Sequence, residues 1–253
     1  MDLLERAAQL RWYHTLELAP GHVTEGMFDL RPIVDRYGLP ERMDGLRVLD
    51  VGTFDGFWAF EMERRGAEVT ALDVDHELEL DWPPRRRGEA DPTARRGDGF
   101  RVAHEIFGST VQRVERNIYH ASPDDLGTFD LVFCGSVLIH LRDQLLALER
   151  IAGLCRGRFI CAEAYDRVLG LLPFPVSRYR ADRRASVVFW EPSARTWRRM
   201  LWTAGFDQVT EHTRFALRSP HGFSVRHVVL HARAGPRAVN REPRTGRPAA
   251  ATS

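Results

Sequence analysis

Short apolar runs alternate with amphipathic stretches along most of the chain. The runs LRVLDVG and AEVTALDVD have the length and composition of buried parallel strands. The segment between them, DGFWAFEMERRG, places apolar residues at helical spacing and stops at a glycine suited to a helix C-cap. The same alternation predicts strands at 46–52, 67–75, 110–119, 129–141 and 158–165, helices at 55–66, 98–109, 142–157 and 192–206, and two closing strands at 207–217 and 223–233.

This order of elements predicts an α/β fold. Strands that alternate with helices form a parallel sheet with helices on both faces, and the two closing strands favour an antiparallel pair. We therefore expect a Rossmann-like, doubly wound, mostly parallel seven-stranded sheet with an antiparallel C-terminal strand. Ligands of such sheets bind beyond the carboxyl ends of the strands, so candidate chemistry is expected just after each strand.

Composition divides the chain into three parts. Residues 1–44 are rich in aromatic and turn residues, and residues 45–233 carry the predicted sheet and helices. Residues 234–253 turn to Ala, Gly, Pro and Arg without any periodicity. We expect this last part to be a disordered basic tail.

All 36 basic residues of the 253-residue chain are arginines. A chain without lysine has no Schiff-base lysine for pyridoxal phosphate, no P-loop lysine and no kinase lysine. The formal charge of +1 creates no overall field that would attract a polyanion. These counts exclude several enzyme classes and make nucleic acid the less favoured partner.

The cysteines and apolar stretches indicate a cytoplasmic protein. Cys134, Cys155 and Cys161 form no CxxC pair and fit no zinc spacing, so we expect buried, reduced thiols and no metal site. The longest apolar stretches are too short to span a bilayer, and the N-terminal MDLLERAAQL favours an amphipathic helix over a signal peptide. We expect no membrane association.

The turn after the first predicted strand carries the first candidate chemistry. In DVGTFDG, Gly52 and Gly56 let the backbone approach a ligand, and the following helix start offers free N–H groups. Phe54 stands where close approach to a pyrophosphate needs glycine, which argues against NAD or FAD. Asp73 ends the second strand, 21 residues past Gly52, and suits the hydroxyls of an adenosine ribose. The alternative interpretation is a turn and an unrelated surface aspartate.

These segments resemble a known family. VLDVGTFDGFWAFEMERRGAEVTALDV is similar to motif I through the acidic loop of class I S-adenosylmethionine-dependent methyltransferases, except that Phe54 replaces their central glycine. Phe129-Asp130, the segment 135–141 and Ala204-Gly205-Phe206 extend the resemblance over residues 46–232. Within that family, SVLIH and the segment 226–230 resemble the branch of the tRNA wobble-uridine carboxymethyltransferase.

The resemblance implies S-adenosylmethionine as the cofactor and assigns roles to residues. It places Asp50 and Gly52 at the methionine end and Asp73 at the ribose. It places Asn117 and Ile118 at the adenine, with Ser136 and Val137 along the cofactor wall. The implied cofactor-binding set is Asp50, Gly52, Thr53, Gly56, Asp73, Asn117, Ile118 and Ser136.

Transfer of a sulfonium methyl group needs chiefly in-line alignment, and a base only where the acceptor must lose a proton. His140, after the fourth strand, is a candidate base or acceptor-orienting group, with structural packing as the alternative. In this family the segment before the core usually covers the acceptor site, which makes His14 a second catalytic candidate. The loop residues Asp81 and Trp82 are expected near the adenine. Candidate acceptor-binding residues are Tyr13, Arg31, Glu163, Arg178, Tyr179 and Arg226.

Two features favour plain methyl transfer over carboxymethyl transfer. The resembling branch holds the extra carboxylate of its cofactor with a lysine, a tyrosine and a C-terminal arginine. Here the tyrosine position is Ile139, lysine is absent, and only Arg226 is present. We therefore expect methyl transfer from S-adenosylmethionine to an oxygen or nitrogen of a small molecule.

Two other functions stay open. A tRNA uridine methyl- or carboxymethyltransferase would need a basic face, for which the arginine pairs and runs at 85–87, 95–96 and 183–184 are candidates. A non-catalytic adenosine-binding protein would keep the glycine turn and Asp73 without turnover. The sequence predicts neither the acceptor nor the oligomeric state.

Overall fold

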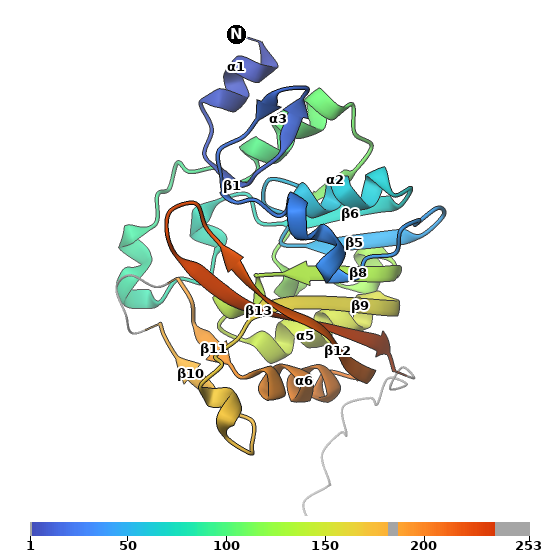
Figure 1. Ribbon diagram of the computed structural model, residues 1–253, viewed down its shortest axis with the longest axis vertical. Coiled ribbons are helices and arrows are strands. Elements are labelled where there is room, and N and C mark those ends of the chain that lie inside the picture. Colours follow the sequence, from blue (N-terminus) through green and yellow to red (C-terminus); the bar gives the residue numbers. More distant parts are fainter. Residues whose placement is uncertain (1, 182–186, 236–253) are drawn as a thin grey trace, which may run out of the picture.

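Seven strands form one continuous sheet at the centre of the protein (Figure 1). The computed structural model describes residues 2–181 and 187–235. The strand order is β12-β13-β9-β8-β5-β6-β7. The strands span Arg47–Val51 (β5), Glu68–Asp73 (β6), Gln112–Glu115 (β7), Phe129–Gly135 (β8), Cys155–Ala164 (β9), Phe206–Arg218 (β12) and Ser224–Ala234 (β13).

The direction of the strands confirms the predicted fold class. Strands β9, β8, β5, β6 and β7 pair in parallel. Strand β13 pairs antiparallel with β9 and with β12, so β12 runs with the parallel strands and β13 alone is reversed. At the centre, Val48, Leu49, Val132 and Phe133 are fully buried. Such burial on both faces is why these strands have continuous apolar sequences.

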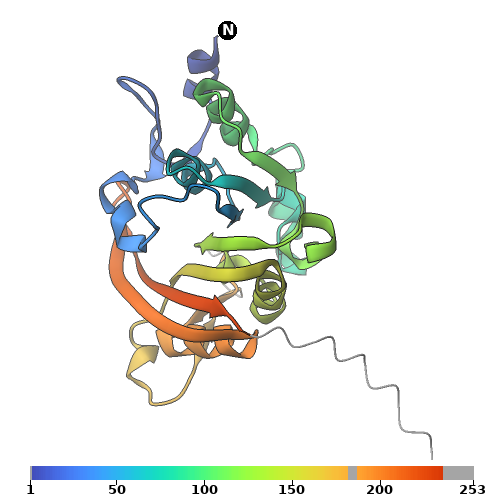
Figure 2. The same ribbon diagram turned by 90° about the vertical axis from the view of Figure 1, so that its right-hand side faces the viewer.

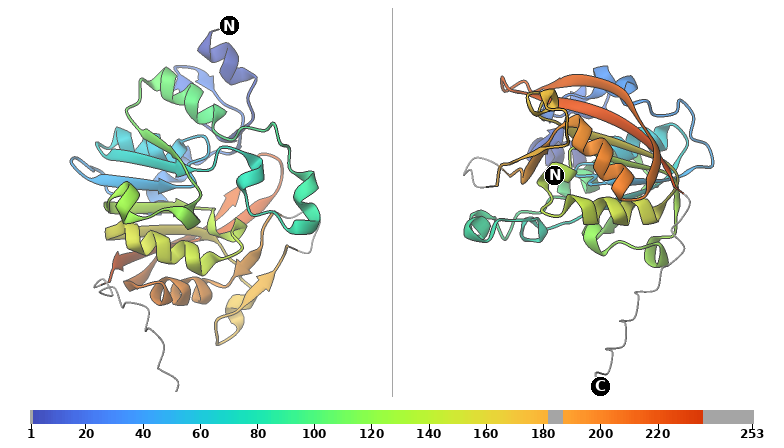
Figure 3. Two further views of the ribbon diagram at one scale, coloured as in Figure 1. Left: turned by 180° about the vertical axis from the view of Figure 1, so that it is seen from behind. Right: turned by 90° about the horizontal axis from the view of Figure 1, so that it is seen from below.

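Helices cover both faces of the sheet. Helices α2 (Phe57–Arg64) and α3 (Asp98–Phe107) pack on one face. Helices α4 (Pro123–Leu126), α5 (Gln144–Leu154) and α6 (Ala194–Thr203) lie on the other, where α5 and α6 are seen side by side in Figure 3. The amphipathic sequences of α3 and α6 therefore face the sheet with one side only.

The N-terminal segment folds onto the face that carries α2 and α3. It contains α1 (Leu3–Ala8), the parallel pair β1 (Trp12–His14) and β4 (Gly26–Phe28), the pair β2 (Glu17–Ala19) and β3 (His22–Val23), and the 3-10 helix η1 (Arg31–Tyr37). Trp12, Phe28 and Tyr37 join one apolar cluster with α2 and α3. Figure 2 shows η1 on one side of the sheet and α5 on the other. This packing brings β1 to the turn after β5.

Two predicted strands are shorter than the sequence pattern suggested. The third ends before the 3-10 helix η4 (Ile118–His120), because the side chain of Asn117 accepts the N–H of Tyr119 (3.0 Å). The fourth ends before η5 (Leu138–His140), because a buried carboxylate of Glu163 accepts the N–H of Val137 and of Leu138 (both 2.9 Å). Side-chain hydrogen bonds to the backbone thus compete with strand pairing at both ends.

The remaining short elements lie in the connections. They are η2 (Glu77–Glu79) and η3 (Pro84–Glu89) between β6 and α3, η6 (Leu169–Leu171) after β9, and the antiparallel pair β10 (Ser177–Tyr179) and β11 (Trp190–Pro192). The three cysteines are buried and unpaired. Ala234 is the last residue of β13; the rest of the predicted tail from 236 on, and Arg183-Arg184, lie outside the described residues. No helix within 2–181 or 187–235 is long and apolar enough to cross a membrane.

Candidate functional site

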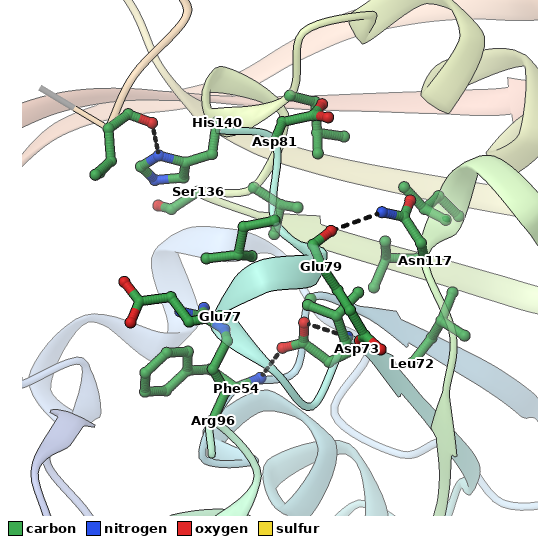
Figure 4. Close-up of a pocket in the computed structure, with 18 of the residues that line it drawn as sticks. Phe54, Leu72, Asp73, Glu77, Glu79, Asp81, Arg96, Asn117, Ser136 and His140 are labelled. Atoms are coloured by element: carbon green, nitrogen blue, oxygen red, sulfur yellow. Dashed lines mark hydrogen bonds between the residues drawn. The ribbon is translucent and has the colours of Figure 1, made fainter. Parts of the chain in front are cut away.

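A cavity of about 370 Å³ opens at the carboxyl ends of β5, β6 and β8 (Figure 4). Here the strand order reverses, since β5 continues to β6 on one side and borders β8 on the other. Such a switch point is the expected ligand site of an open α/β sheet. We call it the central cavity. Of the predicted site residues, its wall contains Tyr13, His14, Gly52, Asp73, Asn117, Ile118, Ser136 and His140.

Gly52 is the point of closest approach between the two central turns. It has a φ of 77°, and a Cβ added there would lie 2.3 Å from Cγ2 of Val137. A side chain at this position would be strained and would displace the wall. We call this turn after β5 the Gly52 cradle, because the glycine lets the backbone of the turn border the cavity.

Phe54, at the position of the family's central glycine, keeps the backbone form that glycine favours. Its φ is 50°, and its N–H donates to Oδ2 of Asp73 (2.8 Å). The ring lies in the cavity wall, with its centroid 5.5 Å from that of Tyr13 and 4.4 Å from the guanidinium carbon of Arg96. The departure from the family pattern thus adds an aromatic surface to the cavity.

Asp73 presents a carboxylate with spare acceptor capacity. Oδ2 accepts the N–H of Phe54, and Oδ1 accepts the N–H of Val74 (2.8 Å) (Figure 4). Burial raises the pKa of Asp73, and the positive charge of Arg96 opposes this. Each oxygen keeps a second lone pair, so this carboxylate suits a pair of neighbouring hydroxyls such as a ribose diol.

An apolar slot follows Asp73 along the wall. Leu72, Val74 and Ile118 line it. Asn117 stands at its edge, donating from Nδ2 to the carbonyl of Glu79 (3.3 Å) and accepting the N–H of Tyr119 at Oδ1. The amide retains one N–H and one lone pair, which fits the polar edge of an adenine ring.

The irregular segment after β6 is fixed over this slot. Oδ2 of Asp81 accepts the hydroxyl of Tyr119 (2.6 Å) and the N–H of Arg142 (2.7 Å). The indole N–H of Trp82 donates to the carbonyl of Glu77 (2.9 Å). Asp81 and Trp82 both line the cavity.

His14 is paired with a carboxylate inside the cavity wall. Its Nδ1 is hydrogen-bonded to Oδ1 of Asp55. Oδ2 of Asp55 accepts the N–H of Tyr13 (2.9 Å) and of His14 (2.8 Å), which fixes the carboxylate to β1. A carboxylate at Nδ1 holds the proton there and leaves the lone pair on Nε2. Nε2 of His14 is therefore a hydrogen-bond acceptor in this arrangement.

His140 lies on η5 on another part of the wall (Figure 4). Its Nδ1 lies 2.9 Å from the carbonyl oxygen of Val187, so Nδ1 carries the hydrogen. Burial lowers the pKa of His140, which keeps the ring neutral and leaves a lone pair on Nε2. Both predicted histidines thus share the cavity, but only His14 has a carboxylate partner among the described residues.

The structure separates most of the predicted acceptor-binding residues from the cavity. Tyr13 lies in the wall, and burial together with Asp55 raises the pKa of its phenol, so the phenol stays protonated. Arg31 is ion-paired with Asp29 (2.8 Å), and Arg178 with Asp166 (2.7 Å). Tyr179 is exposed on β10, and Arg226 lines a different hollow.

Glu163 lies behind the wall and does not reach the cavity surface. It is fully buried, and its Oε1 accepts the N–H groups of Val137 and Leu138. Burial raises the pKa of Glu163 to about 7, although these hydrogen bonds oppose the shift. Its place in the structure is to hold the turn that carries Ser136 and η5.

Replacing Glu163 with glutamine should make the stability of the fold less sensitive to a rise in pH from about 5 to about 8. The folded-state pKa of about 7 lies above the ordinary value of 4.5, so the folded protein binds the proton more tightly and loses stability as pH rises between these values. Two and a half pKa units correspond to about 3 kcal/mol. The free energy of unfolding of both proteins is measured by chemical denaturation at about pH 5 and about pH 8. Between these pH values the wild type should lose up to this amount relative to Glu163→Gln.

The exposed Glu89→Gln variant is the control for that measurement. Equal pH dependence of Glu163→Gln and the wild type would show that Glu163 is not the group that titrates.

Three predicted cofactor-binding residues lie beneath the cavity surface. Asp50 and Thr53 are buried, and their Oδ2 and Oγ1 atoms have no hydrogen-bond partner among the described residues. Burial raises the pKa of Asp50 to about 7. Gly56 starts α2 with a φ of 91°, and a Cβ there would meet Phe60 at 2.3 Å. These three residues support the turn after β5 from the side opposite the cavity.

Two residues of the site were not singled out in the sequence. Asp55 stands in the same turn as Gly52, but its partner His14 is 41 positions away, and no spacing rule joins them. Arg96 was noted only within an arginine pair. It projects over Phe54 in the cavity, and no carboxylate of the described residues lies within ion-pairing distance of it.

The cavity fits an adenosine-containing cofactor with a polar chain. The wall provides an apolar slot, a carboxylate for a diol and a glycine cradle, and the volume of about 370 Å³ falls in the range of roughly 300–1,000 Å³ common for small-molecule sites. Among the described residues, Oδ2 of Asp50 beneath the cradle has no hydrogen-bond partner and is available to a donor there.

Comparison with known proteins gives a family and a fold. Residues 24–211 match the family described as methyltransferase domain. Ubiquinone biosynthesis O-methyltransferase of Vibrio parahaemolyticus is 28% identical over 60% of this chain and 55% of its own. A tRNA U34 carboxymethyltransferase of Desulforapulum autotrophicum is 26% identical over 65% of this chain and 45% of its own. The chain thus spans about half the length of these curated relatives.

A solved structure shows the same architecture. The N-terminal domain of EvdMO1, determined in the presence of SAH and D-fucose, superposes with a TM-score of 0.65 at 20% identity, covering 92% of this chain and 97% of that domain. This likeness concerns the fold. The family match covers most of the sequence that forms the sheet and the cavity. The chain therefore belongs to the methyltransferase domain family, a family of S-adenosylmethionine-dependent enzymes.

Proposed function

We propose that this protein transfers the methyl group of S-adenosylmethionine to an oxygen or nitrogen atom of a small molecule. The observation that carries the proposal is that His14, which is hydrogen-bonded to the buried Asp55, lines the same cavity as Gly52 and Asp73. A proton acceptor and the proposed cofactor site thus share one enclosure. The three free, buried cysteines support a cytoplasmic location.

Residues of three turns would hold the cofactor. Asp73 accepts the ribose hydroxyls, Ile118 and Val74 flank the adenine, and Asn117 faces its polar edge. The backbone at Gly52 lies along the methionine part, with Ser136 opposite. When bound, S-adenosylmethionine supplies an electrophilic methyl group whose sulfonium leaves as a neutral thioether. The protein therefore has to align the acceptor and manage its proton.

His14 is the proposed base. Nε2 of His14 would take the proton that the acceptor oxygen or nitrogen loses when it is methylated. The carboxylate of Asp55 stabilises the imidazolium that results and fixes the ring's orientation. Tyr13, with its protonated phenol, and His140 then orient the acceptor.

Plain methyl transfer fits the residues better than carboxymethyl transfer. Ile139 is buried in the core and not on the cavity wall, and Arg226 lines a separate hollow. The chain has no lysine. None of the three groups that hold a second carboxylate in the carboxymethyltransferase branch is therefore present at this cavity.

Replacing Asp73 with alanine should weaken binding of S-adenosylmethionine by roughly 10–100-fold, because hydrogen bonds to a charged group contribute about 1.5–3 kcal/mol. Titration calorimetry measures this directly. The Asp44→Ala variant, which removes an exposed aspartate paired with Arg42, is the control. An unchanged dissociation constant for Asp73→Ala would refute the ribose assignment.

A tRNA acceptor is the second candidate, favoured by one feature of the surface. A hollow of about 830 Å³ between α6, β12 and β13 is lined by six arginines and one glutamate, with Tyr165 and Trp202. Among the described residues, its one ion pair joins Arg214 to Glu211 (2.7 Å). We call it the arginine hollow. Unpaired guanidinium groups beside aromatic rings suit a phosphate backbone.

The two candidates are separated by charge removal. Under the small-molecule proposal, an Arg198→Ala/Arg199→Ala variant keeps its activity on small acceptors. Under the tRNA proposal, tRNA binding depends on salt and weakens in this variant with a shallower salt slope.

A further inference from the structure

Ser136 stands at the cavity wall in a strained conformation. It has a φ of 58°, which costs a residue with a side chain roughly 1–3 kcal/mol. Its N–H donates to the carbonyl of Ala162 (2.9 Å), which anchors the backbone to β9. Ser136 follows β8 and lines the central cavity (Figure 4). Local contacts must therefore hold Ser136 in this backbone conformation.

The hydroxyl of Ser136 is held by a residue 91 positions away. Oγ lies 2.8 Å from Nε2 of His227 on β13. His227 is 2% exposed, is paired in register with Ala164 of β9, and stacks on Phe215 at a centroid distance of 5.8 Å. The imidazole is therefore fixed in place. It does not line the cavity and has no ligand role of its own.

The neighbours of Ser136 and His227 determine which atom of the pair donates the hydrogen bond. Nδ1 of His227 lies 3.2 Å from the carbonyl oxygen of Val225, which can only accept, so Nδ1 carries the hydrogen. Burial lowers the pKa of His227 to about 4, so the ring is neutral and Nε2 has only a lone pair. The Ser136 hydroxyl must then donate its single hydrogen to Nε2.

A serine hydroxyl that already donates its one hydrogen can only accept further hydrogen bonds. The two lone pairs of Ser136 Oγ are available to the cavity, and no donor function is left. Two acids lie below this part of the wall, since Asp50 and Glu163 are both buried there with raised pKa values. A positively charged donor bound here would be stabilised by the ionised form of either acid, whereas an anion would be repelled by it.

We propose that His227 is a positioning residue that turns Ser136 into an obligate hydrogen-bond acceptor, and that this acceptor receives the ammonium group of S-adenosylmethionine. The proposal rests on the proposed use of that cofactor, and it adds a residue from the reversed strand to the site. Val137, next to Ser136, packs against the Gly52 cradle where the methionine part is expected. An amine on the acceptor molecule has the same chemistry, and the experiment separates the two sources.

The test compares S-adenosylhomocysteine with its deamino analogue, which lacks the ammonium group. Ser136→Gly removes the hydroxyl and suits the positive φ, while His227→Phe removes the lone pair and leaves Ser136 in place. We expect both to weaken S-adenosylhomocysteine by roughly 10–100-fold and to leave the analogue within about twofold of wild type. His227→Gln, whose carbonyl oxygen can accept the hydroxyl, should restore most of the affinity.

Thermal unfolding of each variant shows whether a loss of affinity comes from a folding defect. Ser136→Gly should unfold near the wild-type temperature, because glycine relieves the strain while the buried Nε2 of His227 loses its donor. Equal loss of affinity for both ligands would overturn the proposal, as would no loss for either. A raised KM for an amine acceptor with unchanged S-adenosylhomocysteine affinity would assign Ser136 to the acceptor instead and overturn the cofactor assignment. The binding arms need no turnover, so they are readable even if no acceptor is methylated.

Discussion

Replacing His14 with asparagine is expected to lower the turnover of methyl transfer by ~10²–10⁴-fold, the usual contribution of a general base. The asparagine Nδ2 can still donate to Asp55, so the wall of the cavity is kept while the lone pair of Nε2 is removed. Affinity for S-adenosylmethionine should change by no more than about twofold. Steady-state kinetics with calorimetry on the same preparations measures both quantities.

The same substitution at His140 is the matched comparison. His140 has a backbone carbonyl as its Nδ1 partner and not a carboxylate, so we expect His140→Asn to raise the KM of the acceptor more than it lowers turnover. Asp55→Asn should lower turnover in the direction of His14→Asn, since it removes the charge that stabilises the imidazolium. A larger turnover loss at His140 than at His14 would move the base to η5.

Replacing Gly52 with alanine is expected to abolish measurable cofactor binding, a loss of at least roughly 100-fold in affinity. The added Cβ would lie 2.3 Å from Cγ2 of Val137 and would force the two central turns apart. Calorimetry with S-adenosylmethionine is the measurement. Adding Val137→Ala removes the contacting methyl groups and should restore part of the affinity.

Gly45 provides the control for backbone strain. Its φ of 73° matches that of Gly52, but a Cβ there would meet nothing within 4 Å. Gly45→Ala should therefore cost roughly 1–2 kcal/mol of stability and leave cofactor binding intact. If Gly52→Ala bound S-adenosylmethionine as well as Gly45→Ala does, the cradle would lie elsewhere.

The fold was largely predictable because its signals are local. Apolar runs such as those around Leu49 and Val132 are buried on both faces, and continuous apolar sequence is the direct consequence of that burial. The strand ends were less predictable, because Asn117 and Glu163 stop β7 and β8 through side-chain hydrogen bonds to backbone N–H groups. Such bonds depend on residues brought together by folding.

The residues of the site also differ in how far the sequence predicts them. The cradle at Gly52 and the carboxylate of Asp73 lie in one consecutive strand–turn–helix–strand unit and were predicted from spacing. The pairs His14–Asp55 and Ser136–His227 join distant segments, and no sequence pattern marks them.

Two arginines were predicted to bind the acceptor but lie outside the cavity. Arg31 and Arg178 have the charge of an anion-binding residue, but each is paired with an aspartate, Asp29 or Asp166, before any ligand arrives. Charge in a sequence is a weak guide to a site, because ion pairing depends on neighbours in space. Arg96, which stacks on Phe54 without such a partner among the described residues, was the less conspicuous arginine in the sequence.

One measurement tests the central claim most directly: mass spectrometry of phenols, hydroxy acids, amines and bulk tRNA incubated with S-adenosylmethionine and either the wild type or His14→Asn. The proposal predicts a small-molecule product in which one hydrogen has become a methyl group, formed by the wild type and nearly absent with His14→Asn. Product confined to tRNA nucleosides, an added carboxymethyl group, or equal product from both proteins would contradict it.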